Sequence, residues 1–481
     1  MQALLGYFIV KYKHPAMLLI SLLIMGLALR IIPSLDIHLH QWDECYHALV
    51  AKNISKNGII PTLYPSTILP YDYTDWSSNY IWLHKPPFTL WLIAGSLKIF
   101  GYFAFSVRIP SILFSTITIY LVYRIGILIS HKQFALFAAY LFCINGFLID
   151  LCSGRTATDH VDTLFLFLVT FGIFLSLQDG LRNYKSYYLP VLIGIITGFA
   201  ILTKWIVGIF IILIYGIVLI FYNKQTQIKK FKKLVLATAC SLIISIPWNI
   251  FAYLTYPKEY LYEQLYNLAH ISKSLEGHNK PYWYFIDQAR INWNELIYLY
   301  VIYFVYLIYK KRNIDNIFIL LWIAVPYLLF SLASTKMPAY VAICAPAIFL
   351  LISWSIFCTE YFRFKNFLIA ITIGLGIRYS IERVKPFERF HQQKVIPEFA
   401  YSIYNIDRPI VLFGVEDHIQ AMFFNDVIAY PRYPSKEEFE AIKGKNIQIL
   451  GMDSPELPDY MRNDSSVVKY FPLHYFPKNR Q

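Results

Sequence analysis

The 481-residue sequence has few of the features that mark disulfide-rich, metal-binding or repeat proteins. Its six cysteines are scattered without CxxC spacing, and most lie inside apolar runs, which argues against a disulfide framework or a metal knuckle. It contains no internal repeat with a period of about 20 to 50 residues and no low-complexity tract. What the sequence does contain is a series of long apolar runs.

Charge is also scarce: charged residues make up 15% of the chain, hydrophobic residues make up 57%, and the mean hydropathy is +0.46. This composition is too apolar for a soluble protein, and the length allows roughly ten or more membrane helices of about 20 residues each. The formal charge of +13 does not indicate a nucleic-acid partner, because the basic residues fall mostly in short clusters between apolar runs, where membrane topology explains them. The sequence therefore predicts a polytopic membrane protein.

Apolar runs suitable for spanning helices occur along most of the chain. They cover 16–35, 107–130, 133–151, 161–178, 187–203, 205–222, 233–254, 291–309, 315–333, 338–357 and 366–380. A further run, 87–104, would place every later basic cluster outside if it crossed the membrane, so we predict an interfacial or re-entrant helix there. Residues 1–14 lack a cleavable-signal pattern, so the first span is expected to remain as an anchor. The expected fold is an α-helical membrane protein with about eleven to thirteen transmembrane helices.

The composition changes near residue 381 and predicts two domains. Residues 1–380 form the transmembrane domain, which has two outer-face segments: 36–106, with juxtamembrane helices, and 255–285. Residues 381–481 form a small soluble α/β domain on the periplasmic face. Its strands are expected at 408–414, 427–430 and 446–451, and its helices at 417–425 and after Ser435, where Glu438 completes a capping box. It has no GxGxxG or P-loop motif that would bind a nucleotide.

Two acids, Asp43 and Glu44, follow the first span and are flanked by Trp42 and Tyr46. Charged side chains at a helix end beside the membrane are costly, so they need either a partner or a task. The simpler interpretation is an exposed loop acid beside an aromatic belt. We favour a catalytic role, because three lysines share the same predicted face of the membrane.

Lys85, Lys204 and Lys336 all fall at predicted non-cytoplasmic ends of helices, where the positive-inside rule disfavours lysine. A snorkelling side chain would explain one of them. Three together indicate an anionic ligand at that interface, for which a lipid phosphate or pyrophosphate is the obvious candidate.

The segment 153–162 closes one predicted span and begins the next, and it brings Asp159 and Asp162 to the same outer face. Asp159 suits an N-cap as well as a functional role. Arg155 suits either an ion pair with one of these acids or contact with a phosphate.

The outer segment 255–285 carries His270, Glu276 and His278 among aromatic residues. This mixture suits a sugar, or a lid over one, because sugar ring faces pack on aromatic side chains while polar groups bind hydroxyls. Amphipathic packing at the membrane interface is the alternative. The spacing also permits, but indicates only weakly, a divalent metal site formed by Glu276, His278 and His84.

With these residues placed, the chain resembles the C-type membrane glycosyltransferases, in particular the branch that joins protein O-mannosyltransferases to the bacterial transferases that put aminoarabinose on lipid A. The resemblance covers residues from about 36 to 350, in the order of the family. The matching pieces are Asp43-Glu44, His84-Lys85-Pro86-Pro87, Arg155 to Asp159, Leu202-Thr203-Lys204, Glu276 to Tyr284 and Thr335 to Tyr340.

The resemblance implies a sugar transfer at the inner (plasma) membrane, with the active site on the periplasmic face. The donor would be a polyprenyl-phosphate sugar reached from among the membrane lipids, and the acceptor a hydroxyl of a lipid, a glycan or a protein. Asp43, with Glu44 and Asp159 as further catalytic acids, would accept the proton of that hydroxyl as its oxygen attacks the anomeric carbon with inversion. The residues implied to neutralise the leaving phosphate are Lys85, Arg155, Lys204 and Lys336. Those implied to contact the sugar or the acceptor are Tyr46, His84, His270, Glu276, His278 and Tyr340.

Two positions depart from the lipid A branch. Tyr46 stands where an arginine often follows the Asp-Glu pair, and His84 stands where an acid often precedes Lys-Pro-Pro. The resemblance therefore does not assign aminoarabinose and lipid A as the particular substrates. A transporter or flippase of lipid-linked sugars is the alternative function, but a translocation path would place ionisable groups at mid-bilayer, whereas here they collect at one predicted face.

Overall fold

The computed structural model describes residues 15–156, 159–183, 186–385 and 409–470, and the chain divides into two compact units. The membrane unit comprises Met1–Ser34, Lys85–Thr89 and Pro110–Pro386. The sheet unit comprises Leu35–His84, Leu90–Ile109 and Phe387–Gln481. This division differs from the predicted boundary at residue 381, because most of the segment 36–106 belongs with the C-terminal sheet. The reason is a hydrophobic core that the two segments share.

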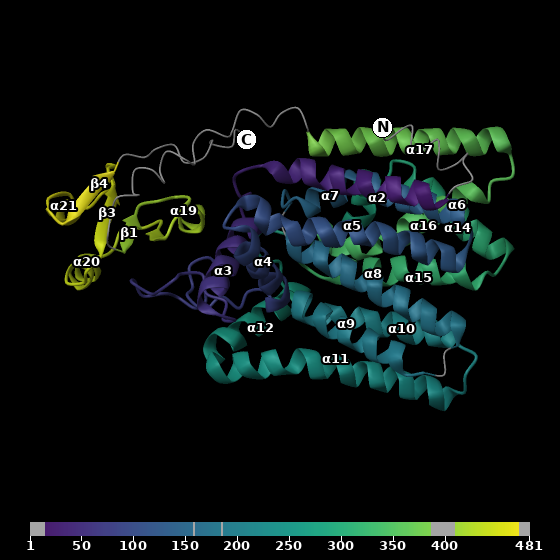
Figure 1. Ribbon diagram of the computed structural model, residues 1–481, viewed down its shortest axis with the longest axis horizontal. Helices are drawn as coiled ribbons and strands as arrows, with labels where there is room; N and C mark the ends of the chain where they lie inside the picture. The colour runs from purple at the N-terminus through teal and green to yellow at the C-terminus, as the bar shows by residue number, and fades with distance from the viewer. Residues whose placement is uncertain (1–14, 157–158, 184–185, 386–408, 471–481) are drawn as a thin grey trace. The chain divides into compact units, whose positions relative to one another are not determined.

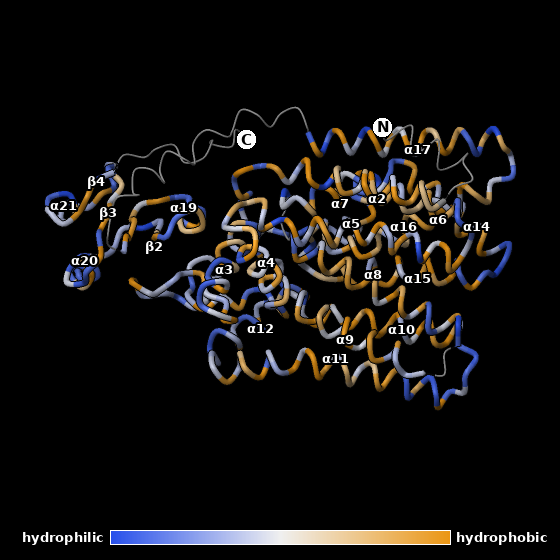
Figure 2. Tube along the Cα trace, in the orientation of Figure 1, coloured by the Kyte–Doolittle hydropathy of each residue, from blue (hydrophilic) through white to orange (hydrophobic). Residues whose placement is uncertain are grey.

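The membrane unit consists of long helices that lie side by side (Figure 1), and hydrophobic residues predominate along most of them (Figure 2). Its helical elements, including α5, which begins in the sheet unit, are α2 (Pro15–Ile31), η1 (Ile32–Leu35), α5 (Ala104–Ile129), α6 (Lys132–Ile144), α7 (Gly146–Cys152), α8 (Asp159–Arg182), α9 (Tyr188–Lys204), η2 (Trp205–Ile209), α10 (Phe210–Phe221), α11 (Gln227–Thr255), α12 (Pro257–Ser272), α13 (Tyr284–Asn292), α14 (Ile297–Lys310), α15 (Ile314–Leu332), η3 (Pro338–Cys344), α16 (Ala345–Phe357) and α17 (Phe362–Val384). The apolar runs predict these helices well, because a backbone away from water must satisfy its hydrogen bonds within one segment.

Within the described residues, seven helical segments are long and apolar enough to cross a membrane. The number rises to nine if two bent pairs, α6 with α7 and α13 with α14, each count as one span. The chain is therefore an integral membrane protein of the expected helical class. The count of about eleven to thirteen spans is not confirmed and stays a prediction.

The segment Tyr188–Phe221 reverses its direction after Lys204. Trp205 has φ +54°, and a Cβ atom on Gly208 would lie 2.4 Å from the backbone nitrogen of Ile201. The residues of η2 therefore fold back against the end of α9, and only glycine fits at this contact. This reversal agrees with the two separate runs expected at 187–203 and 205–222, and it places Lys204 at the turn.

The sheet unit contains a parallel four-stranded sheet with the strand order β2-β1-β3-β4. Its strands are β1 (Ile410–Phe413), β2 (Val427–Tyr430), β3 (Gln448–Met452) and β4 (Val467–Tyr470), and its helices are α3 (Asp43–Asn57), α4 (Pro87–Phe100), α19 (His418–Phe424), α20 (Lys436–Lys443) and α21 (Asp459–Arg462). The three predicted strands, the helix at 417–425 and the Ser435–Glu438 capping box are confirmed. The fourth strand was not predicted, because only Val467 of its four residues is buried.

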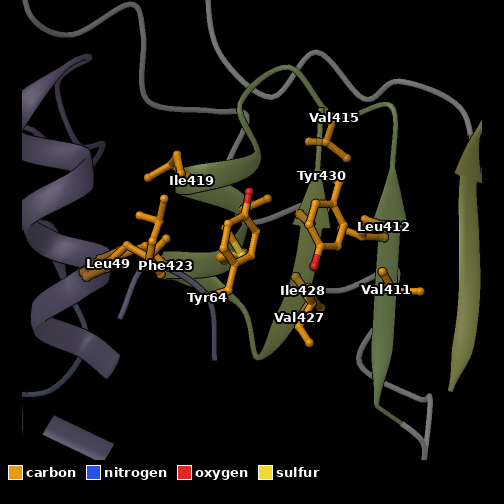
Figure 3. Packing of buried hydrophobic residues seen from close by; sticks show 14 of the residues in the cluster. Leu49, Tyr64, Val411, Leu412, Val415, Ile419, Phe423, Val427, Ile428 and Tyr430 are labelled. Atoms are coloured by element: carbon orange, nitrogen blue, oxygen red, sulfur yellow. The ribbon is translucent and has the colours of Figure 1, made fainter. Parts of the chain in front are cut away.

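Helix α3 is packed into the C-terminal sheet. Leu49 lies against Phe423 in the shared core (Figure 3). The Nζ atom of Lys52 donates to the carbonyl oxygens of Met422, Phe423 and Asn425 at 2.8 to 2.9 Å, and so caps the end of α19 with a positive charge. Burial lowers the pKa of Lys52 to about 8, so this ammonium group is still mostly charged at neutral pH. The helix that begins at Asp43 is thus fixed to the C-terminal part of the chain.

Candidate active site

Asp43 begins α3, and the residue before it holds a strained conformation. Trp42 has φ +71° and ψ −130°, a region that a bulky residue rarely adopts, and its side chain is 68% exposed. Asp43 is partly exposed in the first turn of α3, where the helix dipole favours a carboxylate. Strained turns of this kind cluster at functional sites, so this geometry makes Asp43 a candidate for chemistry.

Glu44 is buried and bound on both oxygens by an arginine of the sheet unit. Arg108 donates from Nε to Oε1 at 2.7 Å and from Nη2 to Oε2 at 3.0 Å, and both side chains are fully buried. The same guanidinium group donates to the carbonyl oxygens of Asp36 and His38, at 2.5 and 2.7 Å. The pair thus fixes the start of α3 to the segment that precedes it.

His40 completes this network. Its Nδ1 atom lies 2.7 Å from Oε2 of Glu44, and its Nε2 atom lies 3.2 Å from Oδ2 of Asp36. Its backbone nitrogen also donates to Oε2 of Glu44, at 2.5 Å. The carboxylate of Glu44 is therefore surrounded by donors before any substrate binds.

The predicted sugar-binding residues Tyr46 and His84 meet in one aromatic cluster. The ring of Trp76 contacts that of Tyr46 edge-on at 4.9 Å between centroids, and it stacks on His84 at 4.8 Å. The indole nitrogen of Trp82 donates to the carbonyl oxygen of Trp76 at 2.9 Å and holds that residue in place. Burial raises the pKa of Tyr46, so its hydroxyl stays protonated at neutral pH. Tyr46 lies one helical turn after Asp43, which brings the aromatic cluster to the same end of α3.

In the membrane unit, Lys204 pairs with a buried acid in the first turn of α8. Its ammonium group forms an ion pair with Asp162 and lies 4.8 Å from the ring centroid of Tyr340, in a cation–π contact. Two of the predicted site residues, Lys204 and Tyr340, are therefore neighbours although they are far apart in the sequence.

Asp159 and Arg155 of the membrane unit contact different residues. Asp159 is fully buried at the start of α8, and its Oδ1 accepts the backbone N–H of His160, whose ring is bound by Ser111 at 2.8 Å. Arg155 donates to the carbonyl oxygen of Val384 at 2.7 Å, at the end of α17. One nitrogen of Arg155 is therefore bound to a carbonyl group, and its contact with a phosphate or an acid stays a prediction.

The segment predicted as an outer loop, 255–285, is mostly helical. Helix α12 occupies Pro257–Ser272, and its amphipathic sequence explains why the apolar runs did not predict it. The residues that follow turn at Glu276 and Gly277, which both have positive φ. The hydroxyl of Tyr266 donates to Glu276 at 2.7 Å, and burial together with this bond raises the pKa of Tyr266.

This turn is joined to the segment before η3. Backbone N–H groups of Thr335 and Lys336 donate to the carbonyl oxygens of His270 and His278, at 3.1 and 3.2 Å. The Nζ atom of Lys336 donates to the carbonyl oxygen of Ala333, and burial lowers its pKa. His270, Glu276, His278 and Lys336, four predicted residues, therefore belong to one structural element.

Lys85 lies just before α4, in the stretch Lys85–Thr89 that belongs to the membrane unit, and is half-buried. Phe88, one turn further on, stacks on Phe199 of α9 at 4.4 Å between ring centroids. This contact brings the start of α4 beside the last turns of α9, the helix that ends at Lys204.

The predicted residues fall into the two units as two sets. Asp43, Glu44, Tyr46 and His84 belong to the sheet unit, and Lys85, Arg155, Asp159, Lys204, His270, Glu276, His278, Lys336 and Tyr340 belong to the membrane unit. Among the residues that the structure describes, no three His, Cys, Asp or Glu side chains form a group that could hold a metal ion.

Comparison with known proteins gives consistent matches. A family model of dolichyl-phosphate-mannose-protein mannosyltransferases matches residues 84–251. The undecaprenyl phosphate-alpha-4-amino-4-deoxy-L-arabinose arabinosyl transferase of Photorhabdus laumondii is 26% identical over 360 residues, which cover 70% of this chain and 60% of that one. A transferase of the same description from Proteus mirabilis is 26% identical over 364 residues, covering 71% and 61%. The chain thus spans about 60% of the length of these curated relatives.

Two solved structures share the fold. ArnT from Cupriavidus metallidurans, bound to undecaprenyl phosphate, superposes with a TM-score of 0.64 at 13% identity, covering 89% of this chain and 88% of that one. The chain therefore shares the fold of this membrane glycosyltransferase. The oligosaccharyltransferase of Archaeoglobus fulgidus in its apo form superposes with a TM-score of 0.55 at 15% identity, covering 87% of this chain and 65% of that one.

Three side chains that contact predicted site residues were not themselves predicted as site residues: Asp162, Trp76 and Arg108. Asp162 and Trp76 lie in segments that the sequence does single out as polar or aromatic. Arg108 lies at the edge of the apolar run 107–130, which the hydropathy pattern assigns to a span. The signal that could have found it is the charge itself, since an arginine at the end of an apolar run needs an acidic partner.

Proposed function

We propose that this chain is an inverting glycosyltransferase that moves a sugar from a polyprenyl-phosphate donor to a hydroxyl acceptor. The observation that carries the proposal is the similarity, over 70% of the chain, to transferases whose names specify an undecaprenyl-phosphate-linked sugar. The family model for dolichyl-phosphate-mannose-protein mannosyltransferases supports the same donor class, because dolichyl and undecaprenyl phosphates are both polyprenyl phosphates. The two departures, Tyr46 and His84, mean that we assign the donor class and not the sugar.

Asp43 is the general base of this proposal. Its carboxylate accepts the proton of the acceptor hydroxyl while the hydroxyl oxygen bonds to the anomeric carbon. The bond from that carbon to the phosphate oxygen breaks with its electron pair, so the products are the glycoside and the free prenyl phosphate. Asp43 lies in the first turn of α3, where the helix dipole favours a carboxylate, and this suits a proton acceptor.

Glu44 and Asp159 receive supporting roles in the proposal. Glu44 acts as a positioning residue, because its carboxylate is already bound by Arg108 and His40. Asp159 fits the first position of α8, where it receives a backbone N–H bond. Both carboxylates would have to break existing contacts to take a proton from a substrate.

The cations of the membrane unit supply the site for the donor phosphate. Charge grows on the leaving phosphate as its bond to the sugar breaks, and a fixed positive charge stabilises that state more than the ground state. Lys85, Lys204 and Lys336 are the proposed contacts, with Arg155 as a fourth. Asp162 holds the ammonium group of Lys204 in place before the phosphate arrives. The turn that contains His270, Glu276 and His278, together with Tyr340, would then face the sugar or the acceptor.

A transfer assay tests this function. The chain, purified in detergent and supplied with a polyprenyl-phosphate sugar fraction and envelope acceptors from its own source, should release free prenyl phosphate and a glycosylated acceptor, both measured by mass spectrometry. Lys85→Ala should raise the donor KM about tenfold, the effect of losing one charge-assisted contact. Lys98→Ala, which removes an exposed lysine of the following helix α4, should behave like the wild type. Absence of chain-dependent transfer would reject the donor class, and unchanged donor kinetics in Lys85→Ala would reject that residue's role.

The active site is proposed to lie on the periplasmic face, and this depends on α4. Its 14 residues extend about 21 Å, which is too short for a hydrocarbon core of ~30 Å. A reporter enzyme joined after Tyr102 should therefore report the periplasm, and one joined after Lys132 should report the cytoplasm. A cytoplasmic signal at Tyr102 would mean that α4 crosses the membrane, and it would overturn this orientation.

A further inference from the structure

The sheet unit contains a cavity of about 420 Å³ that the proposed reaction does not use. One wall comes from the segment 64–80, which follows α3. The other wall comes from Tyr430, Pro431 and Arg432, at the carboxyl end of β2. Two parts of the chain that are far apart in the sequence thus build one pocket.

The segment 64–80 is held at its base and near its start. Its base is closed by an antiparallel bridge between Thr62 and Ile81, and the side-chain amide of Asn53 in α3 donates to the carbonyl oxygen of Thr62 at 2.9 Å. Near its start, the hydroxyl oxygen of Tyr430 accepts the backbone N–H of Leu69 at 3.3 Å. These contacts pre-form the pocket, so a ligand would not have to order the segment when it binds.

The position of the pocket on the sheet has a physical reason. Parallel sheets usually bind ligands beyond the carboxyl ends of their strands, beside the strand where the order reverses, which here is β1. Tyr433 fills that place: its hydroxyl donates to the carbonyl oxygen of Met452 at 3.0 Å, and a Cβ atom on Gly414 would lie only 2.5 Å from it. The space that is left lies at the end of β2, where the segment 64–80 encloses it.

Tyrosine rings form much of the lining. Tyr64 stacks on Tyr430, with ring centroids 5.0 Å apart and planes 16° apart (Figure 3). Tyr71 and Tyr80 line the pocket as a second pair, at 5.8 Å. Such rings offer flat apolar faces together with hydroxyl groups that donate and accept hydrogen bonds.

The charges of the lining disfavour an anionic ligand. Arg432 is engaged by Glu438 through two hydrogen bonds of 2.7 and 2.8 Å, so its charge is already neutralised. Asp72 accepts from Thr74 at one carboxylate oxygen, and Asp75 accepts from Ser77 and Ser78. A carboxylate has about four lone-pair sites, so both groups keep capacity to accept from the hydroxyls of a ligand. Aromatic faces beside carboxylate acceptors match a sugar ring, which has apolar C–H faces and a rim of hydroxyl donors.

We propose that this pocket binds a sugar unit of the acceptor, so that the acceptor of the reaction is a glycan. The claim that the bound sugar belongs to the acceptor rests on the proposed function. Sugar binding by the pocket can be tested without it. The link to the reaction is Trp76, which belongs to the same segment and packs on Tyr46, one turn after Asp43. A glycan held in the pocket would therefore lie on the segment that contacts the start of α3.

Saturation-transfer NMR on the full-length chain in detergent tests the binding. The probe is the mixture of oligosaccharides released by mild acid from the envelope of the source organism, with a peptide digest of the same envelope as a comparison. Tyr71→Ala and Asp72→Asn should each reduce the transfer to sugar ring protons at least fivefold. Tyr73→Ala is the matched control, because Tyr73 lies between these two residues and Tyr80 in sequence and is similarly exposed, but does not line the pocket. Wild-type sugar signals in both pocket variants would overturn the proposal, as would signals from peptides alone.

The transfer assay separates this proposal from the proposed function. If the pocket holds the acceptor, Tyr71→Ala should raise the KM for the acceptor about tenfold while the donor KM stays unchanged. Transfer with an unchanged acceptor KM in Tyr71→Ala would remove the pocket from the reaction and leave the transferase intact. The chain could instead bind sugar in a way that depends on Tyr71 and yet show no transfer activity. That result would support the sugar-binding pocket and reject the transferase. Asp72→Asn is the second variant in case Tyr71→Ala does not fold. It should fold, since asparagine keeps the oxygen that accepts from Thr74.

Discussion

Asp43→Asn is expected to lower the rate of sugar transfer about a thousandfold, the usual loss when a general base is removed. Asparagine has the size of aspartate but cannot take a proton from the acceptor hydroxyl at neutral pH. The loss of charge at the N-terminus of α3 should cost less than about 1 kcal/mol of stability, so the chain should still fold. The rate is measured as sugar moved per folded chain, after size-exclusion chromatography has shown that the variant is monodisperse.

The control for this variant is Asp459→Asn. Asp459 is also the first residue of a helix of the sheet unit, α21, and it is exposed. The variant Asp459→Asn should therefore keep the wild-type rate of sugar transfer. Binding of the polyprenyl-phosphate donor should be similar in Asp43→Asn and the wild type, because the proposed phosphate contacts belong to the membrane unit. Turnover of Asp43→Asn near the wild-type rate would remove Asp43 from the chemistry and require another base.

Much of the membrane unit could be predicted because its helices are encoded locally. Apolar runs predicted α8 and the turn at Lys204 to within a few residues, since a spanning helix needs only a continuous hydrophobic segment. Lys204 and Tyr340 come from separate motifs of the sequence, and the structure makes them neighbours. Helix α12 was missed because its polar and apolar residues alternate around the helix instead of forming a run.

The organisation of the sheet unit could not be predicted in the same way. Its strands could be recognised from the local sequence, since β1 and β2 are short apolar segments next to turn residues. That α3 packs against this sheet, through Leu49 and Lys52, depends on contacts between opposite ends of the sequence. A single sequence carries no signal for such pairings, so the segment 36–106 was assigned to the transmembrane domain, whereas most of it lies in the sheet unit.

The pairing of Glu44 with Arg108 is the second long-range contact that the sequence concealed, and its disruption should have the largest effect on stability. Arg108→Met leaves the carboxylate of Glu44 buried without its arginine, which typically costs about 3–5 kcal/mol. The midpoint temperature for unfolding should therefore fall steeply, as measured by the thermal unfolding of the chain in detergent. Arg378→Met is the control, because Arg378 pairs with Glu382 at the surface, where an ion pair contributes less than about 1 kcal/mol.

The double variant Glu44→Gln/Arg108→Met separates a positioning role of Glu44 from a catalytic one. With the carboxylate neutralised, no buried charge is left unpaired, so more than half of the lost stability should return. The rest stays lost because Arg108 also binds the carbonyl oxygens of Asp36 and His38. If Glu44 only positions α3, the transfer rate per folded chain should fall by about tenfold at most, and the pH dependence of the rate should match that of the wild type. A thousandfold loss in this stabilised variant would instead show that Glu44 takes part in the proton transfer, and Asp43 would then share the role of base.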